Sequence, residues 1–88
     1  MKVYILTVTK ETCDEPACVS TCVYGKGEDA IKAYNKAFDE AKAEAKSYAT
    51  VGEDDEIATD TPYRWWSVYD TSNRYDRITV ELDVKEIR

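Results

Sequence analysis

The periodic stretch at residues 27–49 constrains the fold of this chain more than any other feature. Its apolar residues are spaced three and four apart, which places them on one face of an α-helix and would scatter them on a strand. They are Ala30, Ile31, Tyr34, Ala37, Phe38, Ala41, Ala45 and Tyr48. Glu28 and Asp29 fall in the first turn, where acidic side chains complement the helix dipole. Because an isolated helix of this length is only marginal in water, we expect it to pack on a β-sheet.

Four other segments carry strand patterns. Residues 3–9 are rich in β-branched side chains and apolar on both faces, as in the interior of a sheet. Residues 17–24 and 63–69 are the second and third expected strands, and residues 78–85 alternate apolar and polar side chains with a period of two. The stretch at 50–62 is polar and acidic, and we interpret it as a loop. The sequence therefore predicts an α+β fold, a four-stranded antiparallel sheet in the order ββαββ with one long helix packed on one face. So long a loop leaves the strand order open.

The opening strand, KVYILT at residues 2–7, and the ββαββ order resemble those of many small uncharacterised proteins of bacteria, phages and mobile elements. The resemblance covers the layout alone and implies no role for any residue. At 88 residues the chain is long enough for one domain, which we expect to span 1–88. Its start is too short and too alternating for a signal peptide, and no apolar run reaches the length of a membrane span, so we expect a cytoplasmic protein.

The net charge of −6 is unevenly distributed. Acidic and basic residues balance in the first 27 residues and again in the last 28, so the whole excess lies in residues 28–60. A field of this sign repels nucleic acid and attracts basic surfaces. The helix and the segment after it therefore form the acidic pole of the molecule.

The three cysteines suggest a metal site, but their spacing does not support one. Cys13, Cys18 and Cys22 are spaced C-x4-C-x3-C in a chain that has no His. Two cysteines four residues apart on one strand are separated by roughly 13 Å and cannot share a tetrahedral zinc ion. We expect three reduced thiols. Residues 10–16 are polar and end in Pro, as in a hairpin loop, and a disulfide from Cys13 to Cys18 across this loop is sterically possible, but a reducing cytosol disfavours it.

The acidic stretch offers oxygen ligands for Ca²⁺ or Mg²⁺ but lacks the spacing of an EF-hand loop. Its acids are Glu53, Asp54, Asp55, Glu56 and Asp60. A solvated loop is the simpler interpretation, and a surface for a basic partner is the alternative. We predict neither a metal nor any other cofactor.

The aromatic segment YRWWSVY at residues 63–69 is the strongest candidate for a binding surface. The candidate residues are Tyr63, Arg64, Trp65, Trp66, Tyr69 and Arg74. One helix covers one face of a sheet, so we expect either Trp65 or Trp66 beneath the helix and its neighbour on the opposite face. Apolar aromatic surface that remains uncovered commonly marks an interface. We therefore expect a homodimer built on the aromatic sheet face, or binding of another protein.

Two alternatives remain open. Single-stranded nucleic acid could stack on Trp65, Trp66 and Tyr69, with Arg64, Arg74 and Arg77 near its phosphates. The acidic pole could instead act as a decoy or adaptor for a basic partner. The chain has no His, nucleophile motif or phosphate-binding glycine loop, so we predict no enzymatic activity. The leading hypothesis is a non-catalytic protein-interaction or regulatory domain.

Overall fold

The computed structural model describes residues 1–12, 16–48, 50–57, 63–71 and 73–86, with the backbone alone at residues 57 and 73–75. Within these residues the chain forms strands, one α-helix and a short 3-10 helix. In order they are β1 (Lys2–Glu11), β2 (Cys18–Tyr24), α1 (Gly27–Glu44), η1 (Ala45–Ser47), β3 (Val51–Ile57), β4 (Arg64–Asp70) and β5 (Asn73–Glu86).

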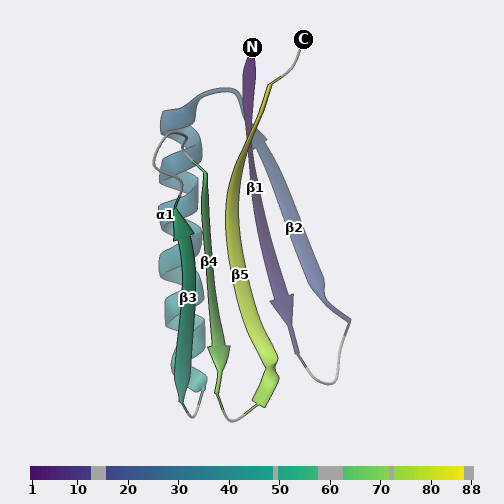
Figure 1. Ribbon diagram of the computed structural model, residues 1–88, viewed down its shortest axis with the longest axis vertical. Helices are drawn as coiled ribbons and strands as arrows, with labels where there is room; N and C mark the ends of the chain where they lie inside the picture. Colours follow the sequence, from purple (N-terminus) through teal and green to yellow (C-terminus); the bar gives the residue numbers. More distant parts are fainter. Residues whose placement is uncertain (13–15, 49, 58–62, 72, 87–88) are drawn as a thin grey trace.

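The strands form one antiparallel sheet in the order β2-β1-β5-β4-β3. Figure 1 shows this sheet with α1 packed behind it, and β1 begins at the same end of the sheet at which β5 ends. The strand β1 lies in the interior, between β2 and β5, as its apolar faces predict. The α+β class and the helix on one face are confirmed, and the strand order that the sequence left open is now defined.

The prediction of four strands is one too few, because residues 51–57 are not part of a loop. They form β3, which pairs with β4 from Val51 opposite Asp70 to Ile57 opposite Arg64. The backbone of Thr71 also donates a hydrogen bond to Thr50 at 3.0 Å. Backbone pairing with an aromatic neighbour therefore outweighs the low strand propensity of the acidic residues. The rest of the expected loop, residues 58–62, lies outside the described residues.

The helix α1 begins at Gly27 as predicted but ends at Glu44, and η1 continues the chain to Ser47. Ala49 lies outside the described residues. Because the 3-10 turn keeps the chain against the sheet, Ala45 is 2% exposed and still belongs to the core. The core joins the helix to β1, β4 and β5 through Leu6, Ala30, Tyr34, Ala41, Ala45, Trp66, Val68, Ile78, Val80 and Leu82. Neither described helix is long and apolar enough to cross a membrane.

Candidate interaction surface

The two adjacent tryptophans of β4 lie on opposite faces of the sheet. Trp66 is 4% exposed and packs beneath the helix, with its ring 4.3 Å from that of Phe38. Trp65 therefore lies on the face that points away from α1, which we call the open face. Tyr63 and Tyr69 share that face by the same alternation, and all three rings are half-buried. The expectation of one tryptophan on each face is confirmed.

Trp65 is flanked by a carboxylate on each neighbouring strand. In the register of the sheet, Glu56 of β3 and Glu81 of β5 lie directly opposite it, one on each side. Directly opposite residues on one face have Cβ atoms about 5 Å apart. The indole ring therefore lies in a row between two acidic side chains, which is a favourable environment for a cation.

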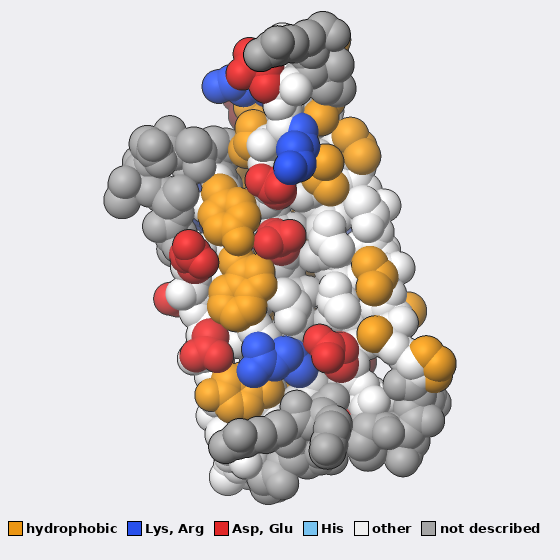
Figure 2. All heavy atoms as spheres, turned by 45° about the vertical axis from the view of Figure 1, so that its right-hand side comes forward, with side chains coloured by type: hydrophobic (Ala, Val, Ile, Leu, Met, Phe, Trp, Pro, Cys, Tyr) orange, Lys and Arg blue, Asp and Glu red, His pale blue; other side chains and the backbone are white. Residues whose placement is uncertain are grey.

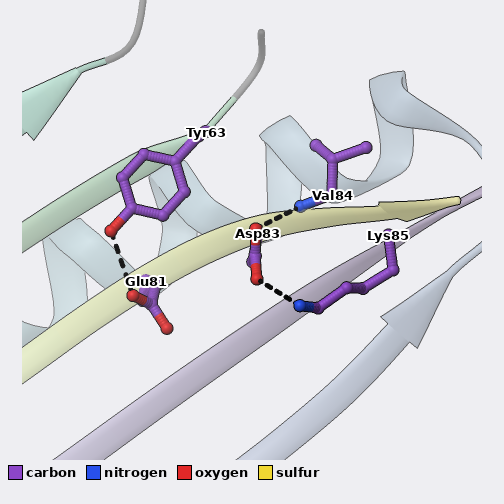
Figure 3. Close-up of polar contacts among 5 residues, drawn as sticks. All are labelled: Tyr63, Glu81, Asp83, Val84 and Lys85. Atoms are coloured by element: carbon purple, nitrogen blue, oxygen red, sulfur yellow. Dashed lines mark hydrogen bonds and ion pairs between the residues drawn. The ribbon is translucent and has the colours of Figure 1, made fainter.

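Tyr63 and Glu81 are joined across β4 and β5. The hydroxyl of Tyr63 donates a hydrogen bond to Oε2 of Glu81 at 3.1 Å (Figure 3). Burial is the main cause that raises the pKa of Tyr63, and this hydrogen bond is the second. The phenol therefore stays protonated and can donate to the carboxylate. Further along β5, Oδ2 of Asp83 lies 3.5 Å from Nζ of Lys85 (Figure 3).

The third ring of this face, Tyr69, lies over a glycine. Gly52 is its partner on β3, and a Cβ atom added there would come within 2.5 Å of Cζ of Tyr69. On the other side, the guanidinium of Arg77 lies over the same ring, 4.8 Å from its centroid. The ring is therefore held between the bare backbone of one strand and a cation on the other.

Of the arginines predicted to accompany the aromatic residues, the described side chains are divided between the two faces of the sheet. Arg64 belongs to the helix side, where its guanidinium lies 5.8 Å from the ring centroid of Tyr34. Arg74 lies in β5, but its side chain is outside the described residues. Of the three arginines expected to face nucleic acid, the structure places Arg77 beside Tyr69 and separates Arg64 from Trp65.

The charge of the open face is predominantly negative. By register its described acids are Glu11, Asp54, Glu56, Glu81 and Asp83, against the cations Arg77 and Lys85. Figure 2 looks onto this face and shows a column of hydrophobic side chains with acidic groups beside it, uncharged side chains in the middle, and further hydrophobic side chains along the opposite edge. By register Ser67 points to the same side, but it is fully buried, and its hydroxyl oxygen lies 3.2 Å from that of Thr79. Sequence reasoning missed Glu56 and Glu81, although strand alternation could have placed Glu81 beside the aromatic residues.

A small cavity lies on the helix side, between α1 and the edge of β3 and β4. Its volume is about 280 Å³, and it is lined by Tyr34, Asn35, Phe38, Glu53, Asp55, Arg64, Trp65 and Trp66. Glu53 also forms an ion pair with Lys42 of the helix, with 3.8 Å between Nζ and Oε1. The volume falls just below the usual range for small-molecule sites, roughly 300–1,000 Å³. We therefore assign no ligand to it.

The cysteine and acidic motifs do not form a metal centre within the described residues, where no group of three His, Cys, Asp or Glu side chains could hold an ion. Cys18 and Cys22 are exposed thiols on the same side of β2, and Cys13 lies outside the described residues. The acids of β3 alternate between the two faces of the sheet. Their alternation separates Glu53 and Asp55 from Asp54 and Glu56.

Comparisons with known proteins find no match: no family model fits this chain, and no curated protein or solved structure is significantly similar to it.

Proposed function

We propose that this protein is a non-catalytic interaction domain whose open face binds a positively charged segment of another protein. The observation that carries the proposal is the row formed by Glu56, Trp65 and Glu81 on three adjacent strands. A Lys or Arg side chain of the partner fits this row because it can stack on the indole ring while its charge meets a carboxylate on either side.

The neighbouring rings extend this row into a surface. Tyr63 and Tyr69 lie on the same strand as Trp65, so a partner that contacts all three covers the length of β4. Half-buried aromatic rings give large contact areas and lose little conformational freedom on binding, and for this reason they are common at the centre of protein interfaces. The surrounding acids then steer a basic partner toward the face.

The charge of the face favours this occupant over the alternatives. A second copy placed face to face would bring the same acidic side chains together, and single-stranded nucleic acid would bring phosphates against them. Arg77 already stacks on Tyr69, while Arg64 lies on the other side of the sheet. The expected homodimer through the aromatic face and the nucleic-acid hypothesis are therefore weaker than a basic protein partner.

A titration of tryptophan emission with model ligands tests the proposal. The probes are a peptide of alternating lysine and valine, the same peptide with glutamate in place of lysine, and a single-stranded oligonucleotide. The lysine peptide is expected to change the emission of Trp65, with an effect that weakens as salt is added. The Trp65→Phe variant should lose this signal, because the remaining Trp66 is buried beneath the helix.

A matched pair of variants separates the face from the net charge. Asp54→Asn with Glu56→Gln removes two charges from the open face, whereas Glu53→Gln with Asp55→Asn removes two from the helix side of the same strand. Two exposed ion pairs contribute about 0.2–1 kcal/mol each, so the first variant should weaken binding roughly tenfold and the second much less. Equal losses of affinity for the lysine peptide in the two double variants would overturn the proposal. Binding of the oligonucleotide in preference to the lysine peptide would also overturn it.

A further inference from the structure

The edge strand β2 is exposed from Cys18 to Val23. Val19 and Val23 are 60% and 64% exposed, and both of its thiols, Cys18 and Cys22, are exposed as well. The strand contains no charged residue and no proline from Cys18 to Tyr24. An open edge of this kind presents unpaired backbone N–H and C=O groups beside apolar side chains, which is the arrangement that pairs with another strand.

The opposite edge of the sheet is protected in a way that β2 is not. There β3 carries Glu53, Asp54, Asp55 and Glu56 in succession, so a second acidic strand would be repelled. Figure 1 shows the two edges at opposite sides of the sheet, with β2 on the side away from the helix. Charge thus blocks one edge against self-pairing and leaves the other available.

We propose that β2 pairs with β2 of a second copy of this chain, antiparallel and centred on Thr21, to form one continuous sheet. This pairing places Thr21 opposite Thr21 of the second copy. It also places Val19 of each copy opposite Val23 of the other, so the valine pair occurs twice. Ser20 then lies opposite Cys22 of the partner on the other side of the sheet. The same segment serves both copies, as a two-fold symmetric interface requires.

The charges near β2 are compatible with this occupant. Each copy has a net charge of −6, so two copies repel each other unless they meet through a neutral surface. On the open face β2 is adjacent to Ile5, Thr7 and Thr9 of β1, which are also uncharged. The neutral strip is therefore two strands wide on that face, and it runs beside the edge where the copies meet.

Pairing also accounts for the exposed apolar side chains and thiols of β2. It brings the exposed valines into cross-strand contact on either side of Thr21 and moves Cys22 to the middle of a sheet. The contact is small, because it consists of one strand pair and its flanking side chains. We expect an association in the micromolar range, as for other small interfaces.

The test is sedimentation velocity across a wide dilution series with three proteins: the wild type, Thr21→Lys and Thr21→Glu. The wild type should form dimers as its concentration rises. Each variant alone should remain monomeric, because the symmetric pairing sets two like charges directly opposite each other. An equimolar mixture of the two variants should restore the dimer, since lysine then faces glutamate.

A second measurement holds even if the charged variants fold poorly. Thr21→Cys, made together with Cys13→Ser, Cys18→Ser and Cys22→Ser, should form a disulfide-linked dimer under mild oxidation. Residues directly opposite in antiparallel strands lie within the Cα separation that a disulfide spans. The same background with Asp54→Cys on the β3 edge is the control and should crosslink far less.

Two results overturn the pairing. One is a wild type that stays monomeric at every concentration, which leaves the edge to a strand of another protein. The other is a dimer that persists in both charged variants and whose Thr21→Cys form crosslinks no better than the control, which places the interface elsewhere. Neither result bears on the binding of a basic partner, because that proposal uses the open face and not the edge.

Discussion

The glycine beneath Tyr69 provides a sharp test of the packing on the open face. No described glycine has a positive φ, so the backbone at Gly52 does not itself require glycine. The ring of Tyr69 does, because an added Cβ atom would lie 2.5 Å from Cζ, 2.6 Å from Cε2 and 2.7 Å from the hydroxyl oxygen. Atoms do not approach this closely, so Gly52→Ala must displace the ring.

The expected cost follows from that displacement. Forcing a methyl group into a filled site destabilises a protein by about 1–3 kcal/mol, and the lower end, about 1 kcal/mol, applies here because the end of a half-buried ring can move toward solvent. The displaced ring also loses its stacking with Arg77, about 0.5–1 kcal/mol at a site of this exposure. In a Tyr69→Ala background the space is empty. There Gly52→Ala should instead stabilise the fold by about 0.4–1 kcal/mol, since alanine restricts the unfolded chain.

The assay is urea unfolding followed by circular dichroism for the four proteins of a double-mutant cycle. We expect a coupling free energy of about 2 kcal/mol and a change in the sign of the alanine effect. Tyr69→Phe is the control, because it keeps Cζ and Cε2 in place and should therefore not rescue Gly52→Ala. If Gly52→Ala costs the same free energy with and without the ring, Tyr69 does not cover the glycine.

Two further predictions concern the core and the dependence of stability on pH. Trp66→Ala should cost about 3–5 kcal/mol, and Trp65→Ala about 1 kcal/mol, because one ring lies beneath the helix and the other on the open face; equal losses in urea unfolding would contradict this assignment. Burial raises the pKa of Tyr34, and the hydrogen bond with Glu44 raises that of Lys10. Both groups bind protons more tightly in the folded state, so stability should be complete below about pH 10, the ordinary pKa of these groups, and decline above it. Tyr34→Phe should reduce this decline measured between pH 8 and pH 11, and an unchanged decline would argue against the tyrosine as its source.

The elements with strong periodic patterns could be predicted from the sequence. The long helix and the alternating residues of β5 were identified because each pattern fits one period and not the other. The strand β3 could not be identified in this way, because four consecutive acids in Glu53–Glu56 have low strand propensity. Its pairing depends on β4, whose Tyr69 covers Gly52, and this contact between distant residues overrides the local preference.

The candidate surface was predictable in part. Adjacent residues on a strand face opposite sides, so the sequence implied that Trp65 and Trp66 separate but could not say which one faces the helix. The same alternation places Arg64 with Trp66, and applying it would have removed Arg64 from the aromatic surface. The position of Glu56 could not be foreseen, because it depends on the unrecognised strand β3 and its register with β4.

The most direct test of the proposed function is the titration of Trp65 emission with the lysine peptide in the two charge-matched variants. We expect Asp54→Asn with Glu56→Gln to weaken binding roughly tenfold, whereas Glu53→Gln with Asp55→Asn should change it much less. This result would place the recognition of a basic segment on the open face. Equal weakening in both variants, or no binding of the lysine peptide to the wild type, would show that the open face does not bind a basic segment.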